Sequence, residues 1–98
     1  MLIRIVVLTF HENTVQEFLA LFEQHAPQIK KYPGCMHLAL YKDIDLYGRF
    51  CVHSVWKDKQ DLENYRSSDF FKGLWSKMKV LFKEKALAFS LHLYQGVG

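Results

Sequence analysis

The chain has 98 residues, a length that suits one domain, and we expect a single domain over residues 1–98. Half of the residues are hydrophobic and 15% are aromatic, which excludes an intrinsically disordered chain. Thirteen basic and ten acidic residues are interspersed and leave a formal net charge of +3, and no recognised nucleic-acid motif is present. We therefore expect no nucleic-acid partner. We also expect no membrane association, because no apolar run approaches the roughly 20 residues of a membrane span.

The first predicted element is a strand over residues 2–10. Its apolar residues occupy both faces, interrupted only by Arg4 and Thr9, a pattern typical of a strand that is buried on both sides. One face would cover helices. The other face needs a different cover, and a second subunit is the simplest candidate.

A helix is predicted next, with Asn13 as its N-cap and Gln16 as the capping-box partner. Apolar residues then recur at helical spacing: Val15, Phe18, Leu19, Phe22, Ala26 and Ile29. Pro27 should kink this helix or turn its last part into a separate turn. Pro33 and Gly34 end the element.

Two strand-like runs follow, separated by a turn rich in Asp, Gly and Tyr: residues 35–42 and residues 49–56. Pairing Arg49 with Lys42 would place His37 and His53 on opposite faces of the sheet. A metal site shared by these two histidines is then not expected. Since there is also no His-x-His, Cys-x-x-Cys or carboxylate cluster, we expect no metal and no cofactor.

The two cysteines lie in these two runs. In the predicted hairpin Cys35 lies near Trp56 and Cys51 near Leu40, several residues apart along the ladder at about 3.3 Å each. That separation is too great for a disulfide. Reduced thiols are typical of a cytoplasmic protein, which is the location we expect.

The last third of the chain predicts two helices and a strand. Asp58 should cap a short helix that reaches about Arg66, and Ser67 or Ser68 should cap the next one. The second helix has an apolar stripe: Phe71, Leu74, Trp75, Met78, Leu81 and Phe82. With a final strand over residues 86–94, the order becomes β-α-β-β-α-α-β. We expect an α+β, ferredoxin-like fold with a four-stranded antiparallel sheet and helices on one face.

The stretch from Tyr32 to Phe71 resembles the antibiotic biosynthesis monooxygenase (ABM) domain of the dimeric α+β barrel superfamily. The resemblance rests on the order and separation of a few residues: Pro33, Gly34, Cys35, Trp56, Leu62, Ser68 and Phe71. It implies a homodimer in which two sheets pack face to face, and a pocket between the sheet and the helices of each subunit. Some members of this family oxidise quinol- or anthrone-type substrates with molecular oxygen and no metal or flavin. Others bind and degrade haem.

The chain departs from these relatives where they carry their chemistry. Val6, Tyr65 and Trp75 stand where haem-degrading relatives have Asn, Trp and His. Val6 cannot hydrogen-bond a ligand and Trp75 has no free lone pair for iron, so we expect no haem. Tyr65 and Ser54 stand where quinol-oxidising relatives tend to have His and Glu. The catalytic residues therefore stay unknown from the sequence.

The leading hypothesis is a cofactor-independent monooxygenase acting on a small phenolic or quinol-like molecule in an apolar, aromatic-lined pocket. The candidate pocket residues are His37, Tyr65, Trp75, Phe22 and Phe71. An alternative is a non-enzymatic dimeric ligand-binding or stress-response module, which the missing His and Glu favour. A third possibility is that the dimer interface itself is the function, within a larger assembly. For each candidate residue, packing in the core is the alternative role.

Overall fold

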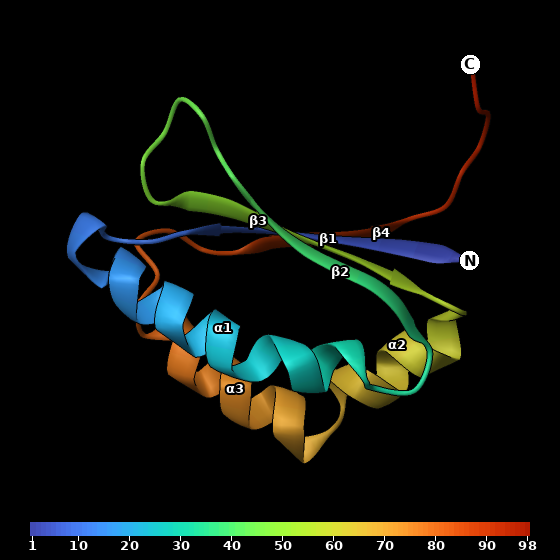
Figure 1. The fold of residues 1–98 in the computed structure, drawn as a ribbon, viewed down its shortest axis with the longest axis horizontal. Helices are drawn as coiled ribbons and strands as arrows, with labels where there is room; N and C mark the ends of the chain where they lie inside the picture. The colour runs from blue at the N-terminus through green and yellow to red at the C-terminus, as the bar shows by residue number, and fades with distance from the viewer.

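The computed structural model describes residues 1–98 and places one antiparallel sheet over a layer of helices (Figure 1). The elements are β1 (Leu2–Thr9), the 3-10 helix η1 (Glu12–Thr14), α1 (Val15–Lys30), β2 (Cys35–Lys42), β3 (Arg49–Trp56), α2 (Lys59–Arg66), α3 (Asp69–Lys79) and β4 (Leu87–Leu91). The predicted β-α-β-β-α-α-β order and the ferredoxin-like α+β class are confirmed. No helix is long and apolar enough to cross a membrane.

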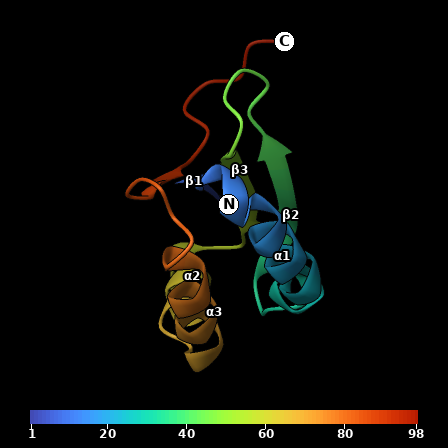
Figure 2. The ribbon, with the colours of Figure 1, turned by 90° about the vertical axis from the view of Figure 1, so that its left-hand side faces the viewer.

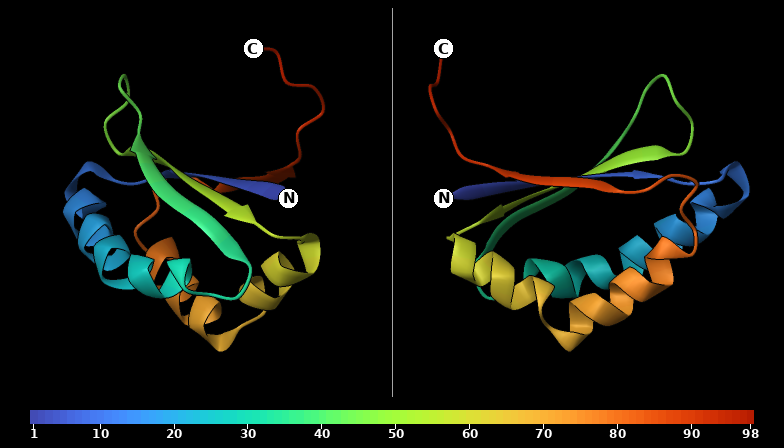
Figure 3. Two further views of the ribbon diagram at one scale, coloured as in Figure 1. Left: turned by 45° about the vertical axis from the view of Figure 1, so that its right-hand side comes forward. Right: turned by 180° about the vertical axis from the view of Figure 1, so that it is seen from behind.

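The sheet has the strand order β2-β3-β1-β4, so the first strand lies inside the sheet, between β3 and β4. All helices lie on one side of it, with α1 beside the pair formed by α2 and α3, and the other side is left uncovered (Figures 2 and 3). Side chains alternate along a strand, so β1 sends Arg4, Val6 and Leu8 toward the helices and Ile3 and Ile5 away from them. The apolar residues on the two sides of this strand thus have different surroundings. One set faces the helices, and the other lies on the sheet face that no helix covers.

The hydrophobic core lies between the sheet and the helices. Phe10, which follows β1, stacks on Phe18 of α1 with ring centroids 4.1 Å apart. Both rings are almost fully buried, as is Trp56 at the end of β3. Such aromatic pairs stabilise a small core beyond the area that they bury.

The predicted start of the first helix is wrong by one residue, because the N-cap is Thr14 and not Asn13. Asn13 lies inside η1, and α1 begins after Thr14. The Thr14 hydroxyl donates to the backbone oxygens of His11 and Leu81, each at 2.9 Å, which ties this junction to the end of the α3 segment. Pro27 does not split the helix, because α1 continues unbroken to Lys30.

The predicted hairpin register is wrong by one residue, because Lys42 pairs with Phe50 and not with Arg49. The carboxylate of Asp43 accepts hydrogen bonds from the backbone N–H groups of Asp45 and Leu46, so the turn starts directly after Lys42. Arg49 belongs to the closure of this turn, where its side chain donates to Asp43 at 2.9 Å.

A bulge near the start of β2 restores the predicted pairing at the other end of the hairpin. Cys35 lies opposite Trp56 as predicted, whereas Cys51 lies opposite Tyr41 and not Leu40. Both cysteines are free thiols in the structure.

The caps of the last two helices are confirmed. Asp58 accepts a hydrogen bond from the backbone N–H of Asp61, and Ser68 accepts one from that of Phe71. The final strand is shorter than predicted, at Leu87–Leu91 instead of residues 86–94. It pairs only with β1, and beyond Leu91 it runs past the start of that strand, where few partners remain.

Candidate functional site

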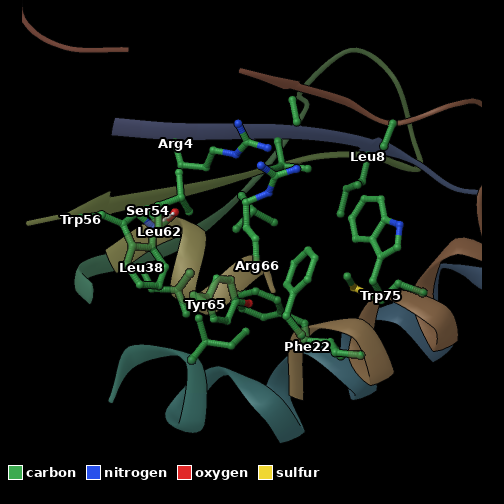
Figure 4. Close-up of a pocket in the computed structure, with 18 residues that line it drawn as sticks. Arg4, Leu8, Phe22, Leu38, Ser54, Trp56, Leu62, Tyr65, Arg66 and Trp75 are labelled. Carbon is green, nitrogen blue, oxygen red and sulfur yellow. Dashed lines mark hydrogen bonds between the residues drawn. The ribbon is translucent and has the colours of Figure 1, made fainter. Parts of the chain in front are cut away.

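A cavity of about 260 Å³ lies between the inner face of the sheet and the helices (Figure 4). Eighteen residues line it, and fifteen of them are hydrophobic, so the chemistry of its wall depends on very few polar groups. These polar residues are Arg4, Ser54 and Arg66. Tyr65 also lines the cavity and adds a phenol hydroxyl.

The structure brings four of the five predicted pocket residues to this cavity. Phe22 comes from α1, Tyr65 from α2, and Phe71 and Trp75 from α3. The rings of Phe71 and Trp75 stack with centroids 5.8 Å apart, and Tyr65 meets Phe71 edge-on at 5.0 Å. Three helices therefore supply an aromatic wall opposite the sheet.

His37, the fifth predicted residue, does not line the cavity. The one-residue change of register places it on the outer face of the sheet, beside His53, with ring centroids 5.1 Å apart. The prediction that these two histidines face opposite sides is wrong for the same reason. His37 therefore has no contact with anything held inside the cavity.

Tyr65 is buried, with 8% of its surface exposed, and its ring stacks on Trp56. Burial raises the pKa of its hydroxyl well above the usual range, and the nearby Cys35 and Tyr32 act in the same direction. None of the side-chain hydrogen bonds in the protein involves this hydroxyl, and the ring lines the cavity. Tyr65 is thus a protonated phenol at neutral pH, suited to donate a hydrogen bond and unsuited to act as a base.

Ser54 has a structural partner. Its Oγ accepts a hydrogen bond of 3.0 Å from the indole Nε1 of Trp56, and both residues are buried. The indole N–H would otherwise be left without an acceptor in the core. The hydroxyl of Ser54 therefore fixes the position of the Trp56 indole.

The sequence interpretation missed the two arginines of the cavity. Arg4 appeared there only as an interruption of an apolar strand, although a lone charge on the helix-facing side of a buried strand is itself a signal. Its Nη1 donates to Ser90 on β4 at 3.1 Å. Burial lowers the pKa of Arg4, the charge of Arg66 lowers it further, and Glu63 opposes them. The side chains of Arg4 and Arg66 point toward one another below β1 (Figure 4).

The rest of the molecule offers no second chemical centre of comparable kind. No three His, Cys, Asp or Glu side chains come together in an arrangement that could hold a metal ion. The cavity is therefore the candidate functional site.

Fold and site define an α+β ferredoxin-like domain with an apolar cavity between its sheet and its helices. Residues 1–74 match the family model described as antibiotic biosynthesis monooxygenase, and the chain belongs to this ABM family. Members of the family commonly form dimers. A comparison with curated proteins finds no match.

Solved structures share the fold at low sequence identity. An antibiotic biosynthesis monooxygenase is 17% identical with a TM-score of 0.89, over 97% of this chain and 100% of the other. A conserved protein from Methanosarcina mazei Go1 is 22% identical with a TM-score of 0.86, over 93% and 91%. A mutant form of SnoaB, a cofactor-independent oxygenase from Streptomyces nogalater, is 17% identical with a TM-score of 0.86, over 98% and 95%.

Proposed function

We propose that this protein is a monooxygenase that oxidises a small aromatic substrate of the phenolic or quinol type inside the cavity, without a metal or organic cofactor. The observation that carries the proposal is the cavity wall, in which aromatic and aliphatic side chains from the sheet and all three α-helices surround a single space. Family membership and the structural likeness to a cofactor-independent oxygenase support the reaction class.

The size of the cavity limits the substrate. An engineered protein cavity of about 150 Å³ accommodates benzene. The cavity here is about 260 Å³, which suits a substituted single ring or a compound of two fused rings. Its lining of Phe22, Phe71 and Trp75 fits the flat face of such a compound.

The proposed reaction needs no external reductant. A phenol loses its hydroxyl proton, and the resulting anion has carbanion character at the ring carbons ortho and para to the oxygen. One of these C–H carbons transfers electrons to O₂, a C–O bond forms to give a hydroperoxide, and loss of water leaves a quinone. One oxygen atom of O₂ enters the product and the other leaves in water, while the substrate ring supplies all four electrons.

The residues of the cavity position the substrate and stabilise its anion. The lining has no histidine or carboxylate, so in this reaction the proton passes to water beside Arg66, whose side chain is 43% exposed. The guanidinium groups of Arg4 and Arg66 favour the anionic form of the substrate. Tyr65 donates a hydrogen bond to a substrate oxygen. The apolar wall excludes water from the reactive anion.

We also propose that the protein works as a homodimer formed through the outer face of the sheet. No helix covers this face, and apart from His37 and His53 it is mainly apolar over all four strands. Its apolar residues are Ile3, Ile5, Val7, Ala39, Tyr41, Val55, Leu87, Phe89 and Leu91. Leu87, Phe89 and Leu91 are 60%, 45% and 47% exposed. A contiguous apolar surface of this kind is typical of an interface.

A second candidate function is ligand binding without reaction. It is favoured by one observation, the absence of a histidine or carboxylate base from the cavity wall. The same cavity would then hold a flat aromatic molecule and release it unchanged.

Oxygen uptake by the purified protein tests the proposal and separates the two candidates. We expect saturable uptake with members of a panel of hydroquinones and naphthols, unchanged by EDTA. Binding of these compounds without any uptake would contradict the monooxygenase and leave the binding module. Uptake that EDTA abolishes would contradict the cofactor-independent reaction.

A further inference from the structure

The two arginines of the cavity form a pair of like charges at one end of an otherwise apolar space. Arg4 comes from the middle of the sheet and Arg66 from the last turn of α2, and no acidic residue lines the cavity with them. Figure 4 shows both guanidinium groups turned toward the same region. Two cations that converge in a cavity without an acidic residue in its wall have unused hydrogen-bonding and charge capacity.

The protein supplies little to neutralise this pair. Arg66 forms an ion pair with Glu63 at 3.4 Å, but both side chains are about half exposed, where such pairs contribute little. Arg4 is half-buried and donates to the neutral hydroxyl of Ser90. Repulsion from Arg66 contributes to the lowered pKa of Arg4, which shows that the two charges act on each other. Even with Glu63 counted, one positive charge remains at this end.

We propose that Arg4 and Arg66 together bind an anionic oxygen group of the ligand, so that the cavity selects flat aromatic compounds that carry a carboxylate or an ionised phenol at one end. The proposal rests on the proposed function for the identity of the cavity as the substrate site. Guanidinium groups bind carboxylate and phenolate oxygens through short, charge-assisted hydrogen bonds. The aromatic wall holds the rings, and the arginines fix which end of the compound lies near the opening.

The pair also gives the ligand a direction in the cavity. The charged group lies between β1 and the end of α2, and the apolar rings extend toward Trp75 on α3. A neutral compound of the same shape would bring no charged acceptor to the two guanidinium groups, which would keep only their contacts with Ser90 and Glu63. A site built to bind a charged oxygen discriminates against a compound that lacks one.

Isothermal titration calorimetry with three matched probes tests the proposal: 2-naphthoate, 2-naphthol and 2-naphthalenemethanol. All three have the same fused rings, and near neutral pH only naphthoate is charged in free solution. We expect naphthoate to bind at least tenfold more tightly than the neutral naphthalenemethanol. Near neutral pH, absorbance spectroscopy on bound 2-naphthol shows whether the protein shifts it to the naphtholate, which separates a phenolate from a carboxylate as the preferred group.

Three Arg-to-Gln variants complete the design, because the chain has one arginine outside the cavity. Arg4→Gln and Arg66→Gln should each weaken naphthoate binding by about tenfold to hundredfold, the affinity equivalent of one hydrogen bond to a charged group. Both should leave naphthalenemethanol binding unchanged. Arg49→Gln removes the same charge at the β2–β3 turn and should leave both affinities unchanged. Circular dichroism checks the fold of each variant, and Arg66 is the safer site because it lies on the surface.

Equal affinities of the unaltered protein for naphthoate and naphthalenemethanol would overturn the proposal. So would Arg4→Gln and Arg66→Gln proteins that bind naphthoate like Arg49→Gln, or a protein that binds neither naphthoate nor naphthol. These measurements involve no turnover. Arginine-dependent binding without oxygen uptake would therefore contradict the monooxygenase proposal and still support the anion-binding site.

Discussion

The ring of Tyr65 stacks on the indole of Trp56, with centroids 4.9 Å apart and planes inclined by 28°. Trp56 is held in turn by the hydrogen bond from its Nε1 to Ser54. The contact joins β3 to α2 and forms one end of the cavity. A residue pair that looks like ordinary core packing thus also sets the position of the only phenol in the site.

Loss of the Ser54 hydroxyl should destabilise the protein. Ser54→Ala leaves the buried indole N–H of Trp56 without its acceptor, so we expect the free energy of unfolding to fall by about 1–3 kcal/mol. Urea denaturation measures the change. Ser76→Ala is the matched control on the exposed side of α3 and should stay within about 0.5 kcal/mol of the unaltered protein. Equal stability of the two variants would contradict this role for Ser54.

The buried phenol of Tyr65 predicts a dependence of stability on alkaline pH. Its pKa is raised in the folded protein, so the folded state holds the proton more tightly than the unfolded chain. This contribution is fully present below about pH 10, the ordinary tyrosine value, and is lost as the pH rises further. Burial also raises the pKa of the Cys35 and Cys51 thiols, which act with the same sign from a lower pH.

Tyr65→Phe should therefore reduce the loss of stability above about pH 10, measured as the free energy of unfolding in urea at several pH values. Tyr94→Phe serves as the control, because Tyr94 lies in the exposed tail. A Tyr65→Phe protein whose stability falls with pH as steeply as that of the control would show that Tyr65 is not held as the structure describes.

A charge at the centre of the outer sheet face should separate the proposed dimer. Ile5 lies between His53 on β3 and Phe89 on β4 in the middle of this face. We expect light scattering to give twice the 11.6 kDa chain mass for the unaltered protein and the single chain mass for Ile5→Asp. Val80→Asp changes an exposed apolar residue outside this face and should stay dimeric. A monomeric unaltered protein would refute the proposed interface.

Filling the cavity should abolish ligand binding without removing any polar group. Ala88 on β4 lines the cavity, and a larger side chain at this position would occupy space that the ligand needs. We expect Ala88→Leu to weaken binding of 2-naphthoate at least tenfold in calorimetry while the fold is kept. Ala20→Leu, on the exposed side of α1, adds the same volume elsewhere and should bind normally. Normal binding by Ala88→Leu would place the ligand outside this cavity.

Much of the fold could be predicted from the sequence because its local signals agree with one another. The caps at Asp58 and Ser68 and the turn at Gly34 between α1 and β2 mark boundaries through backbone chemistry. Gly34 also has a positive φ of 88°, a conformation that favours glycine. The start of α1 was harder to predict, because Thr14 bonds to Leu81, far away in the sequence.

The site could be predicted only in part, and the hairpin shows why. A single bulge and the turn built on Asp43 change the face on which His37 lies, and neither feature has a strong sequence signal. The aromatic wall follows from helical periodicity, which is robust to small errors. The approach of Arg4 and Arg66 depends on the packing of α2 against β3, the neighbour of β1 in the sheet, which no local pattern reveals.

Incorporation of labelled oxygen from ¹⁸O₂ tests the central claim most directly. For a compound in the panel that supports oxygen uptake, we predict one ¹⁸O atom per product molecule by mass spectrometry, with the second atom in water. The yield should fall sharply in Ala88→Leu and persist in Ala20→Leu. Unlabelled product, or labelling that is equal in the two variants, would contradict a monooxygenase that works in this cavity.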